Sequence, residues 1–453
     1  MMIGRRFRCY PTPAQQDKLR LWIRCQRFIY NSKVEELDYF LKFSKFALPL
    51  TGVAVPIDQK YSHFMGDGAE WLRKCPSDIR VFAATNWMYA YRRFQTGLSA
   101  RPRRHKDKGN GSVWISSRLF RFEAGEAKNG SFHTIWVGRP RNPEHVVGHI
   151  PFRAHLDYQI PKSVHLVREA GKWYLTFAFD DGLQIPDEAE TVEWLAGFGE
   201  DELLQKAIGV DRGVVTPVVT SEGAFLEIPP DQKESMKRDE AKMKRWKRRI
   251  RRRKPGSANW RKACDQVAKT ASHAKNVRND FAHKASRSIV NAGKPLIVFE
   301  DLRIPNMVKR PAPAPGTNGR WLPNGASQKK GLTRGILDSS WGRIDKYTRQ
   351  KALAKGMLCV KAQPRYSSQE CSKCGHVQTE NRVSQDTFQC QVCSYESNAD
   401  LNAAKVLAKR GAAMVANEGY SPKKRKRYGV CRKKKKSKEL GPGRPEVTLG
   451  ESE

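Results

Sequence analysis

Four cysteines in two closely spaced pairs are the first residues whose type and spacing suggest chemistry. Cys371 and Cys374 are two residues apart, Cys390 and Cys393 likewise, and fifteen residues separate the pairs. Each CxxC turn supplies two thiolates to one ion, and four such ligands satisfy the tetrahedral preference of zinc. We therefore expect these four cysteines to bind zinc. A site with four protein ligands is closed to substrate, so it is predicted to be structural.

Three acidic side chains stand beside apolar segments. Asp211 ends "AIGVD", Glu300 ends "PLIVFE", and Asp400 lies just before the helical pattern "LNAAKVLAKRG". A carboxylate at the end of a buried strand is costly unless it is ionised beside a cation or hydrogen-bonded. Three together could hold two magnesium ions, which prefer oxygen ligands. Such a pair of ions activates water and stabilises the leaving oxygen of a phosphodiester.

Any one of these carboxylates alone is better explained as an ordinary strand-end or helix-cap residue. The occurrence of three, on separate elements of one predicted sheet, favours a catalytic metal site.

The segments around the three carboxylates predict an α/β sheet. Apolar strands at "AIGVD", "PLIVFE" and "MLCVKAQP" alternate with helical patterns, the longest of which is broken at Pro255-Gly256. The segment "ILDSSWGRIDKYTRQKALAKG" predicts one further helix. Strands that alternate with helices favour a sheet covered on both faces.

The N-terminal part of the chain has two different patterns. Residues 12–109 are mostly helical, with Thr12 as a predicted N-cap before Pro13 and Ser77 as the cap of a second helix. From Ser112 to Asp181, short segments rich in β-branched and aromatic residues are separated by Gly, Asn and Asp. This pattern predicts a small antiparallel barrel or sandwich.

The composition indicates a polyanionic partner. The 453 residues carry a formal net charge of +38, and 39% of them are hydrophobic, enough for a folded core. No apolar segment approaches the roughly 20 residues of a membrane span, and the N-terminus lacks the apolar core of a signal peptide, so we expect an intracellular protein. The other cysteines are scattered singly, which predicts free thiols: Cys9, Cys25, Cys75, Cys264, Cys359 and Cys431.

The order of these motifs resembles the RuvC-type nuclease core of TnpB proteins, the transposon-encoded RNA-guided nucleases related to the compact type V CRISPR effectors. The matching segments are "IGVDRG … VTSEG", "IVFEDL" and the CxxC pairs leading into "DLNAAK". "FRCYPTPAQQDKLRLWIRCQRFIYN" resembles the family's opening strand and first helix, and "QPRYSSQECSKCG" its approach to the zinc site. The resemblance covers most of the chain.

The resemblance implies an α/β RNase H-like (RuvC) nuclease domain with an inserted four-cysteine zinc ribbon, a small β-barrel wedge domain and a helical recognition lobe. Asp211, Glu300 and Asp400 match the family's catalytic carboxylates. The implied domains are a wedge at 1–11 and 110–203, a helical recognition lobe at 12–109 and a nuclease domain at 204–370 and 395–420. The zinc ribbon at 371–394 helps hold nucleic acid. The basic tail at 421–453 is expected to be disordered without a partner.

The implied activity is magnesium-dependent cleavage of double-stranded DNA that is matched by a guide RNA and flanked by a short motif. Four positions depart from the family's pattern, one of which is Pro217, inside the second apolar strand, where it would remove a ladder hydrogen bond if that strand is central. Asn398 stands where an acidic residue often precedes the third carboxylate, and Asp386 where an arginine often precedes the second CxxC. Arg212 follows the first carboxylate where an apolar residue is common. None of these changes removes one of the three carboxylates.

The most basic helical segment is "KMKRWKRRIRRRK", from Lys242 to Lys254. A helix with this density of cations is hard to explain as ordinary surface, so we expect it to contact RNA or the guide–target duplex; the alternative is an exposed charged face. The predicted contact residues are Arg245, Arg248, Arg249, Arg251, Arg252 and Lys254.

Two other functions are compatible with parts of the sequence. One is an RNA-guided DNA-binding protein that silences or marks its target without cutting, against which the intact carboxylates argue. The other is a zinc-ribbon RNA-binding protein of the translation or processing machinery.

The expected partners are a guide RNA and double-stranded target DNA, and no association with a membrane is expected. The protein is expected in the cytoplasm of a prokaryote, associated with the nucleoid. The sequence leaves open the guide, the flanking motif, transposon or CRISPR context, and monomer or homodimer.

Overall fold

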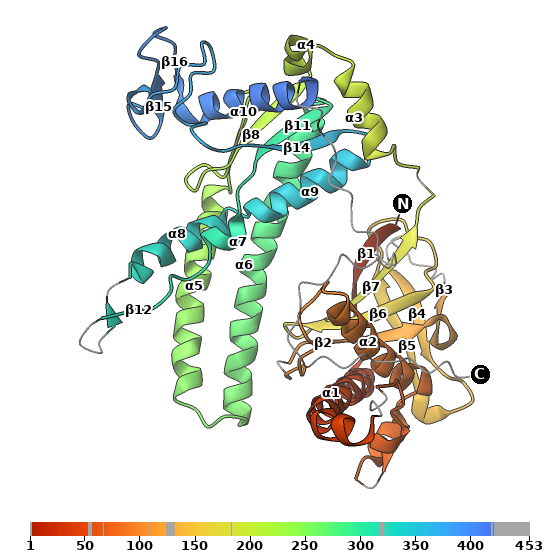
Figure 1. Ribbon diagram of the computed structural model, residues 1–453. Coiled ribbons are helices and arrows are strands. Elements are labelled where there is room, and N and C mark those ends of the chain that lie inside the picture. Colours follow the sequence, from red (N-terminus) through yellow and green to blue (C-terminus); the bar gives the residue numbers. More distant parts are fainter. Residues whose placement is uncertain are drawn as a thin grey trace. The chain divides into compact units, whose positions relative to one another are not determined.

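The computed structural model describes residues 2–52, 57–66, 68–107, 109–123, 132–182, 184–316, 321–322, 324–417 and 420 (Figure 1). These residues fall into two compact units, one ending at Gly182 and one beginning at Gln184. The predicted basic tail at 421–453 lies outside the described residues. Within the described part of the chain, no helix has the length and apolar character needed to cross a membrane.

The first unit contains a seven-stranded antiparallel sheet in the order β2-β6-β7-β1-β5-β4-β3. The N-terminal strand lies in the middle of this sheet, paired along its whole length with β7 and at its end with β5. The strands are β1 (Met2–Cys9), β2 (Gly111–Ser116), β3 (Phe120–Glu123), β4 (Phe132–Gly138), β5 (Val146–Arg153), β6 (Ser163–Glu169) and β7 (Lys172–Asp180).

Two helices pack on this sheet, α1 (Pro13–Thr51) and α2 (Ser77–Gln95). Thr12 caps α1 as predicted, in a capping box with Gln15. The predicted cap of α2 is wrong by one residue: Ser77 is the first helical residue, because the carbonyl of Pro76 accepts the first helical hydrogen bonds. Leu19, Ile79 and Phe7 lie in one shared core, so the helices and the sheet form a single unit.

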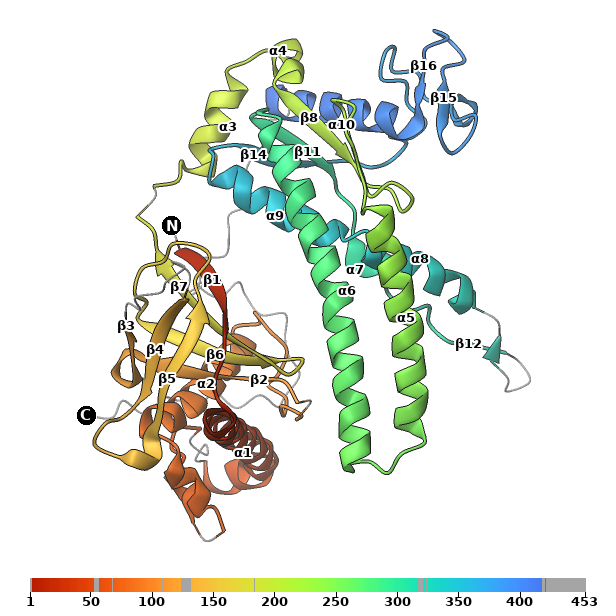
Figure 2. The ribbon, with the colours of Figure 1, turned by 180° about the vertical axis from the view of Figure 1, so that it is seen from behind.

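The second unit is an α/β structure, as predicted. Its sheet has the order β10-β9-β8-β11-β14, in which β8, β11 and β14 are parallel. The strands are β8 (Ala207–Asp211), β9 (Val218–Thr220), β10 (Phe225–Leu226), β11 (Leu296–Glu300) and β14 (Leu358–Ala362). One face packs against α3 (Glu188–Ala196), α4 (Glu200–Gln205) and α10 (Ala399–Ala416), and the other against α6 (Ala258–Asn291) and α9 (Trp341–Leu353) (Figures 1 and 2).

Two features of this unit differ from the sequence prediction. Residues 188–203, which the sequence prediction placed with the wedge, span α3 and most of α4, and these helices pack on α10 in the second unit. The single helix predicted from "ILDSSWGRIDKYTRQKALAKG" is two helices, α8 (Ala326–Asp338) and α9, because Ser340 between them has a left-handed backbone conformation with φ of 60°.

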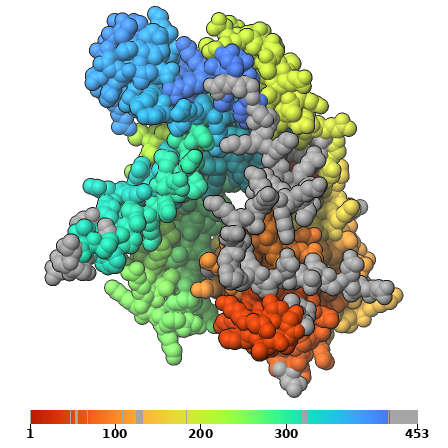
Figure 3. Space-filling model, viewed as in Figure 1, coloured from red at the N-terminus to blue at the C-terminus, as the bar shows by residue number. Residues whose placement is uncertain are grey.

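The predicted helical pair around Pro255-Gly256 is present as α5 (Pro230–Arg251) and α6, an extended hairpin that reaches beyond the sheet (Figure 2). Three shorter elements lie between β11 and α8: α7 (Ile304–Met307), β12 (Ala314–Pro315) and β13 (Trp321–Leu322). The cysteine segment contains a small hairpin, β15 (Thr387–Gln389) and β16 (Glu396–Asn398), so the ribbon continues beyond residue 394 to Asn398. In the space-filling view the ribbon and α10 make up the blue surface (Figure 3).

Candidate active site and zinc ribbon

Strand alternation places Asp211 and Glu300 on the same face of the sheet. Val210 and Phe299 are buried in the core that includes α6 and α9, whereas Val298 is buried in the core that includes α10. Because successive side chains on a strand point to opposite faces, Asp211 and Glu300 project toward α10. Their strands are parallel neighbours, with Phe299 opposite Val210 in the register, so both carboxylates stand at the same edge of the sheet.

The third carboxylate is carried by α10 itself. Asp400 is the second residue of this helix, so the prediction that it lies just before the helix is wrong by two residues. Asn398 is the N-cap, and its side-chain oxygen accepts hydrogen bonds from the backbone N–H groups of Asp400 (3.0 Å) and Leu401 (3.1 Å). This cap explains Asn398 structurally, because it fixes the first helical turn and with it Asp400.

Two glycines let α10 approach the sheet closely. A Cβ at Gly209 on β8 would overlap the backbone carbonyl of Ala404, and a Cβ at Gly411 on α10 would overlap the Val298 side chain. Gly209 is two residues before Asp211, and Ala404 is one helical turn after Asp400. The contact of β8 with α10 therefore determines how closely two of the carboxylates approach.

The electrostatics indicate that the three carboxylates share one region. Burial, followed by the charges of Glu300 and Asp400, raises the pKa of Asp211 from 3.8 to about 7. Burial also raises the pKa of Glu300, against the opposing effect of the Arg212 charge. The pKa of Asp400 is raised by burial and lowered by the nearby Arg382. Placing several anions here is unfavourable without cations, which is the property expected of a metal site.

The carboxylates are less tightly clustered than the cysteines. Among the described residues, one group of potential metal ligands has all its ligand atoms within 4.8 Å of one another, and that group is the four cysteines. The acidic site nevertheless has the donor set that suits magnesium, since it offers carboxylate oxygens and no thiolate or imidazole.

Arg212 is a buried cation beside the acidic site. Its side chain is 4% exposed, and Nη2 donates a hydrogen bond to the backbone carbonyl of Glu300 at 2.6 Å. Its other two guanidinium nitrogens are buried without a hydrogen-bond partner among the described residues. The guanidinium also lies 5.5 Å from the centre of the Phe299 ring. Arg212 therefore joins the end of β8 to the end of β11, where Asp211 and Glu300 stand.

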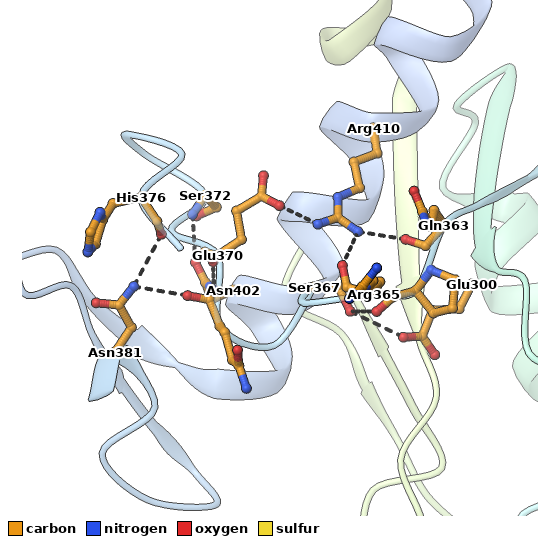
Figure 4. A network of polar contacts seen from close by, with 12 residues as sticks. Glu300, Gln363, Arg365, Ser367, Glu370, Ser372, His376, Asn381, Asn402 and Arg410 are labelled. Carbon is orange, nitrogen blue, oxygen red and sulfur yellow. Dashed lines mark hydrogen bonds and ion pairs between the residues drawn. The ribbon is translucent and has the colours of Figure 1, made fainter. Parts of the chain in front are cut away.

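A polar network connects Glu300 with the loop that leads into the ribbon (Figure 4). The Ser367 hydroxyl lies 3.4 Å from Glu300 Oε1 and 3.0 Å from the Pro364 carbonyl. Arg410 on α10 donates to the carbonyls of Gln363 (2.6 Å) and Arg365 (2.9 Å) and forms an ion pair with Glu370. The loop is thereby fixed to both β11 and α10.

The cysteines have the geometry of a closed tetrahedral site. The Sγ atoms of Cys371 and Cys393 are 3.6 Å apart, as are those of Cys374 and Cys390. Four thiolates at the usual Zn–S distance of about 2.3 Å on a tetrahedron would be separated by about 3.8 Å. The backbone N–H groups of Lys373 and Cys393 lie 3.4 and 3.5 Å from the sulfurs of Cys371 and Cys390. The cluster thus fits a zinc ribbon, and the remaining described cysteines are free thiols as predicted.

Two fully buried asparagines hold the ribbon in place (Figure 4). Asn402 on α10 accepts from the backbone N–H of Ser372 (2.9 Å) and donates to the carbonyl of Glu370 (2.7 Å). Asn381 donates to the carbonyls of Gln369 (2.9 Å) and His376 (3.2 Å) and accepts from the N–H of Gln391 (2.9 Å). The first CxxC turn is therefore bound directly to the helix that carries Asp400.

Sequence reasoning did not find Ser367, Arg410, Asn402 or Asn381. Ser367 lies within the quoted segment "QPRYSSQECSKCG", but its type alone gives no sign of a contact with Glu300. The partners of Arg410 are 40 to 47 residues away in the chain, so no local pattern reveals them.

The predicted basic contact residues lie at the tip of the α5–α6 hairpin, separate from the carboxylates. Arg245, Arg248, Arg249 and Arg251 are in the last turns of α5, and Arg252 and Lys254 follow it. All six are exposed, and none has an acidic partner among the described residues, although Arg249 lies over the Trp246 ring. Nearer the start of α5, by contrast, Arg238 pairs with Glu234 and Lys244 with Glu240.

Comparison with known protein families gives three matches. The chain matches the Cas12f1-like TNB domain over residues 341–407 and "Probable transposase" over 196–310. Residues 1–37 match the helix-turn-helix domain of the same transposase family.

Two curated proteins are similar over nearly the whole chain. "Putative RNA-guided DNA endonuclease InsQ" of Escherichia coli (strain K12) is 27% identical over 423 residues, which cover 91% of this chain and 92% of that protein. "Putative RNA-guided DNA endonuclease" of Streptomyces pristinaespiralis is 24% identical and covers 92% of each chain. "CRISPR-associated endodeoxyribonuclease Cas12f1" of Sulfoacidibacillus thermotolerans is 47% identical over 58 residues, 13% of this chain and 14% of that one.

Among solved structures, the "Cas12f1-sgRNA-target DNA complex" aligns with a TM-score of 0.50 at 15% identity, covering 87% of this chain and 82% of that chain. At this identity the match shows a shared fold, the RuvC-type nuclease fold that the resemblance implied. The transposase models match its N-terminus and its central region, and relatives named as RNA-guided DNA endonucleases match almost its full length, which supports the predicted resemblance to TnpB proteins.

Proposed function

We propose that this protein is an RNA-guided DNA endonuclease that cuts DNA matched by a guide RNA and flanked by a short motif. The observation that carries the proposal is the placement of Asp211, Glu300 and Asp400: two neighbouring parallel strands and the helix above them direct three carboxylates to one edge of the sheet. The nearly full-length relatives named as RNA-guided DNA endonucleases support the same function.

In this proposal the three carboxylates hold divalent cations, with magnesium as the expected metal. Two bound magnesium ions would activate a water and stabilise the leaving oxygen of the scissile phosphodiester. The protein's own contribution is to hold the carboxylates in a fixed arrangement. Arg212 joins the ends of β8 and β11, Ser367 contacts Glu300, and Asn398 caps the helix that carries Asp400.

We assign zinc to Cys371, Cys374, Cys390 and Cys393 as a structural ion. The sulfur separations and the closed donor set support this assignment. Through Asn402 the ribbon would fix the start of α10, Asn381 would bind the turns of the ribbon together, and the ribbon would hold bound nucleic acid near the carboxylates.

The tip of the α5–α6 hairpin is proposed as a nucleic-acid contact surface. The observation in its favour is that six exposed cations lack acidic partners among the described residues, while Arg238 and Lys244, earlier on the same helix, pair with glutamates. Phosphates of the guide RNA or of the guide–target duplex would supply the missing counter-charges.

Cleavage of a plasmid that carries a sequence matching the co-purified RNA tests the proposal. The wild-type protein should linearise the plasmid in magnesium, and Asp211→Ala should bind the same DNA without cutting it. Asp201→Ala, which removes an exposed carboxylate on α4, is the matched control and should cut normally. If Asp211→Ala cuts like the control, the site assignment is wrong; if the wild type binds but never cuts, the protein is a guided DNA-binding protein.

A further inference from the structure

The first unit contains a cavity of about 180 Å³ beside α1 that the proposed nuclease site does not explain. Arg24, Phe28, Asn31 and Glu35 line it at intervals of three or four residues, so they lie on one face of the helix. Arg104, from the basic segment that follows α2, also lines it.

The segment that carries Arg104 is held in place by specific contacts of its neighbour His105. The side-chain amide of Asn31 accepts a hydrogen bond from the backbone N–H of His105 (2.7 Å) and donates one to its carbonyl (3.1 Å). The His105 ring stacks on Tyr30, with 4.1 Å between ring centres. The segment that carries Arg104 is therefore fixed against α1, and the cavity is a built feature of this unit.

The cavity carries more positive than negative charge. Arg104 forms an ion pair with Glu35 (2.6 Å), and the third lining arginine, Arg27, pairs with Asp107 (2.7 Å). Arg24 has no hydrogen bond or ion pair among the described residues; its guanidinium lies over the Trp71 ring at 4.6 Å. One guanidinium is thus held in place by an aromatic ring with its hydrogen-bond donors available to an anion.

The cavity also offers an aromatic surface. Phe28 is 37% exposed and contacts Trp71 edge to face, with 5.6 Å between ring centres. A cavity of about 150 Å³ is large enough to accept a benzene molecule. The available volume therefore accommodates one planar ring beside Phe28. Aromatic side chains combined with arginine are how proteins bind unpaired bases of a single strand.

We infer that this cavity binds one unpaired nucleotide of the nucleic acid that the protein carries, with the base against Phe28 and a phosphate on Arg24. The inference rests on the proposed function only in requiring a nucleic-acid partner, and it does not require cleavage. The ion pairs with Asp107 and Glu35 account for the charges of Arg27 and Arg104. They explain neither the unpaired Arg24 nor the exposed Phe28.

Photocrosslinking from the cavity tests the inference directly. The full-length protein is prepared with p-benzoylphenylalanine in place of Phe28, together with its co-purified RNA and a matching DNA duplex, with either the RNA or the DNA labelled. A crosslink to one nucleotide position is expected. A crosslink in the RNA assigns the nucleotide to the guide, and one in the DNA assigns it to a DNA strand. The absence of a discrete crosslink in both arms overturns the inference.

Binding by two variants gives an independent measurement. Stacking of a base on an aromatic ring corresponds to a change in affinity of about 5- to 150-fold. Phe28→Leu and Arg24→Gln should each weaken binding of the labelled co-purified RNA or of the matching DNA duplex by about fivefold or more. Arg103→Gln is the matched control, because Arg103 is exposed on the same basic segment but does not line the cavity.

The inference is overturned if both variants bind like Arg103→Gln. These measurements record binding and crosslinking, so a wild-type protein that fails to cut would refute the proposed nuclease activity and leave the test of the cavity intact. Conversely, normal cleavage by Phe28→Leu and Arg24→Gln together with unchanged binding would refute nucleotide binding in the cavity and leave the proposed nuclease activity intact.

Discussion

The guanidinium of Arg382, in the zinc ribbon, lies 3.5 Å from Asp400 in the first turn of α10, measured between Nη2 and Oδ1. The same guanidinium donates a hydrogen bond to the carbonyl of Gln385 at 2.9 Å, which fixes it within the ribbon. Arg382 lowers the pKa of Asp400, whereas Asp386 raises it. Two ribbon residues of opposite charge, Arg382 and Asp386, thus shift the pKa of one proposed metal ligand, Asp400, in opposite directions.

This arrangement predicts opposite effects for two substitutions. Arg382→Gln should raise the pKa of Asp400 and shift the pH profile of cleavage toward alkali. Asp386→Asn should lower that pKa and shift the pH profile of cleavage toward acid. Because the groups are partly exposed, each shift of the pH profile should be about 0.15–0.7 pH units, corresponding to about 0.2–1 kcal/mol.

The measurement is the initial rate of plasmid cleavage across pH and magnesium concentration, with guide-dependent DNA binding recorded in parallel. Binding should be unchanged in both variants. Shifts in the same direction for Arg382→Gln and Asp386→Asn would contradict an electrostatic effect on Asp400 and would indicate general damage to the ribbon.

The raised pKa of Asp211 predicts how stability depends on pH when magnesium is absent. The folded protein holds this proton up to a pH of about 7, whereas an unfolded chain releases it near 3.8. The stabilisation that the folded state gains from the proton on Asp211 is therefore complete below pH 3.8 and is lost as the pH rises toward 7. Asp211→Asn stays neutral, so it should be more stable than the wild type at pH 8, by up to about 4 kcal/mol, and equal to it near pH 4.

Thermal unfolding in magnesium-free buffer at both pH values measures this difference, which should appear as several degrees at pH 8. Asp201→Asn, at an exposed position, should show no gain at either pH. A gain for Asp211→Asn that is equal at pH 4 and pH 8 would show that packing, and not charge, is responsible.

The strands of the site could be predicted from sequence because each is a short apolar segment that ends in an acidic residue. Parallel pairing and side-chain alternation then place Asp211 and Glu300 on one face without further information. The four-cysteine site could be predicted for a similar reason, since both ligands of each pair are local in the chain.

The residues that fix these ligands could not be predicted in the same way. Arg410 bonds to carbonyls of a loop more than forty residues away, and Asn402 bonds to a turn thirty residues away. The boundary between α8 and α9 depends on the left-handed conformation of Ser340, although the helical pattern continues across it. Contacts of this kind arise from tertiary packing, which local propensity does not encode.

Close packing of α10 predicts that β8 does not tolerate a side chain at Gly209. In Gly209→Ala the new methyl group would collide with the backbone of Ala404 and push the helix away from the sheet. The expected result is a loss of about 1–3 kcal/mol or more in the free energy of unfolding, with cleavage lost because Asp400 moves away from Asp211. Gly223→Ala is not a suitable control, since Gly223 has a left-handed φ of 84°.

Gly331→Ala on α8 is the appropriate control, because a Cβ there meets no neighbouring atom within 4 Å and alanine favours the helix. It should leave the unfolding temperature unchanged or slightly raised and keep full activity. Equal cleavage by Gly209→Ala and Gly331→Ala would show that α10 does not need this close approach.

Loss of zinc is predicted to disconnect the ribbon from α10. Cys374→Ser removes one thiolate, and the remaining three should hold the ion much more weakly. The zinc content, measured by mass spectrometry, should fall from one ion per chain, and the bonds of Asn402 to the ribbon and of Asn381 within it should be lost with the ribbon's fold. Cleavage should then fail even at saturating magnesium.

Cys264→Ser, which changes a cysteine on α6 outside the ribbon, should keep both the zinc and the activity. Full cleavage by Cys374→Ser without bound zinc would contradict a role of the ribbon in fixing Asp400.

The unpaired cations at the hairpin tip predict a change in the salt dependence of RNA binding. Replacing Arg248, Arg251 and Arg252 with Gln removes three exposed charges that have no acidic partner among the described residues. Each phosphate contact that is lost should reduce the slope of log affinity against log salt by about 0.7 on single-stranded RNA, so three losses should reduce it by about 2.

The measurement is a titration of the co-purified RNA at several salt concentrations. Arg238→Gln lies on the same helix but already pairs with Glu234 at 3.1 Å, so it should leave the slope unchanged. Because the tip is separate from the carboxylates, DNA already bound by the triple variant should still be cut at the normal rate. An unchanged slope in the triple variant would mean that the tip is an exposed charged surface, and the counter-charge for this highly basic chain would then have to be bound elsewhere.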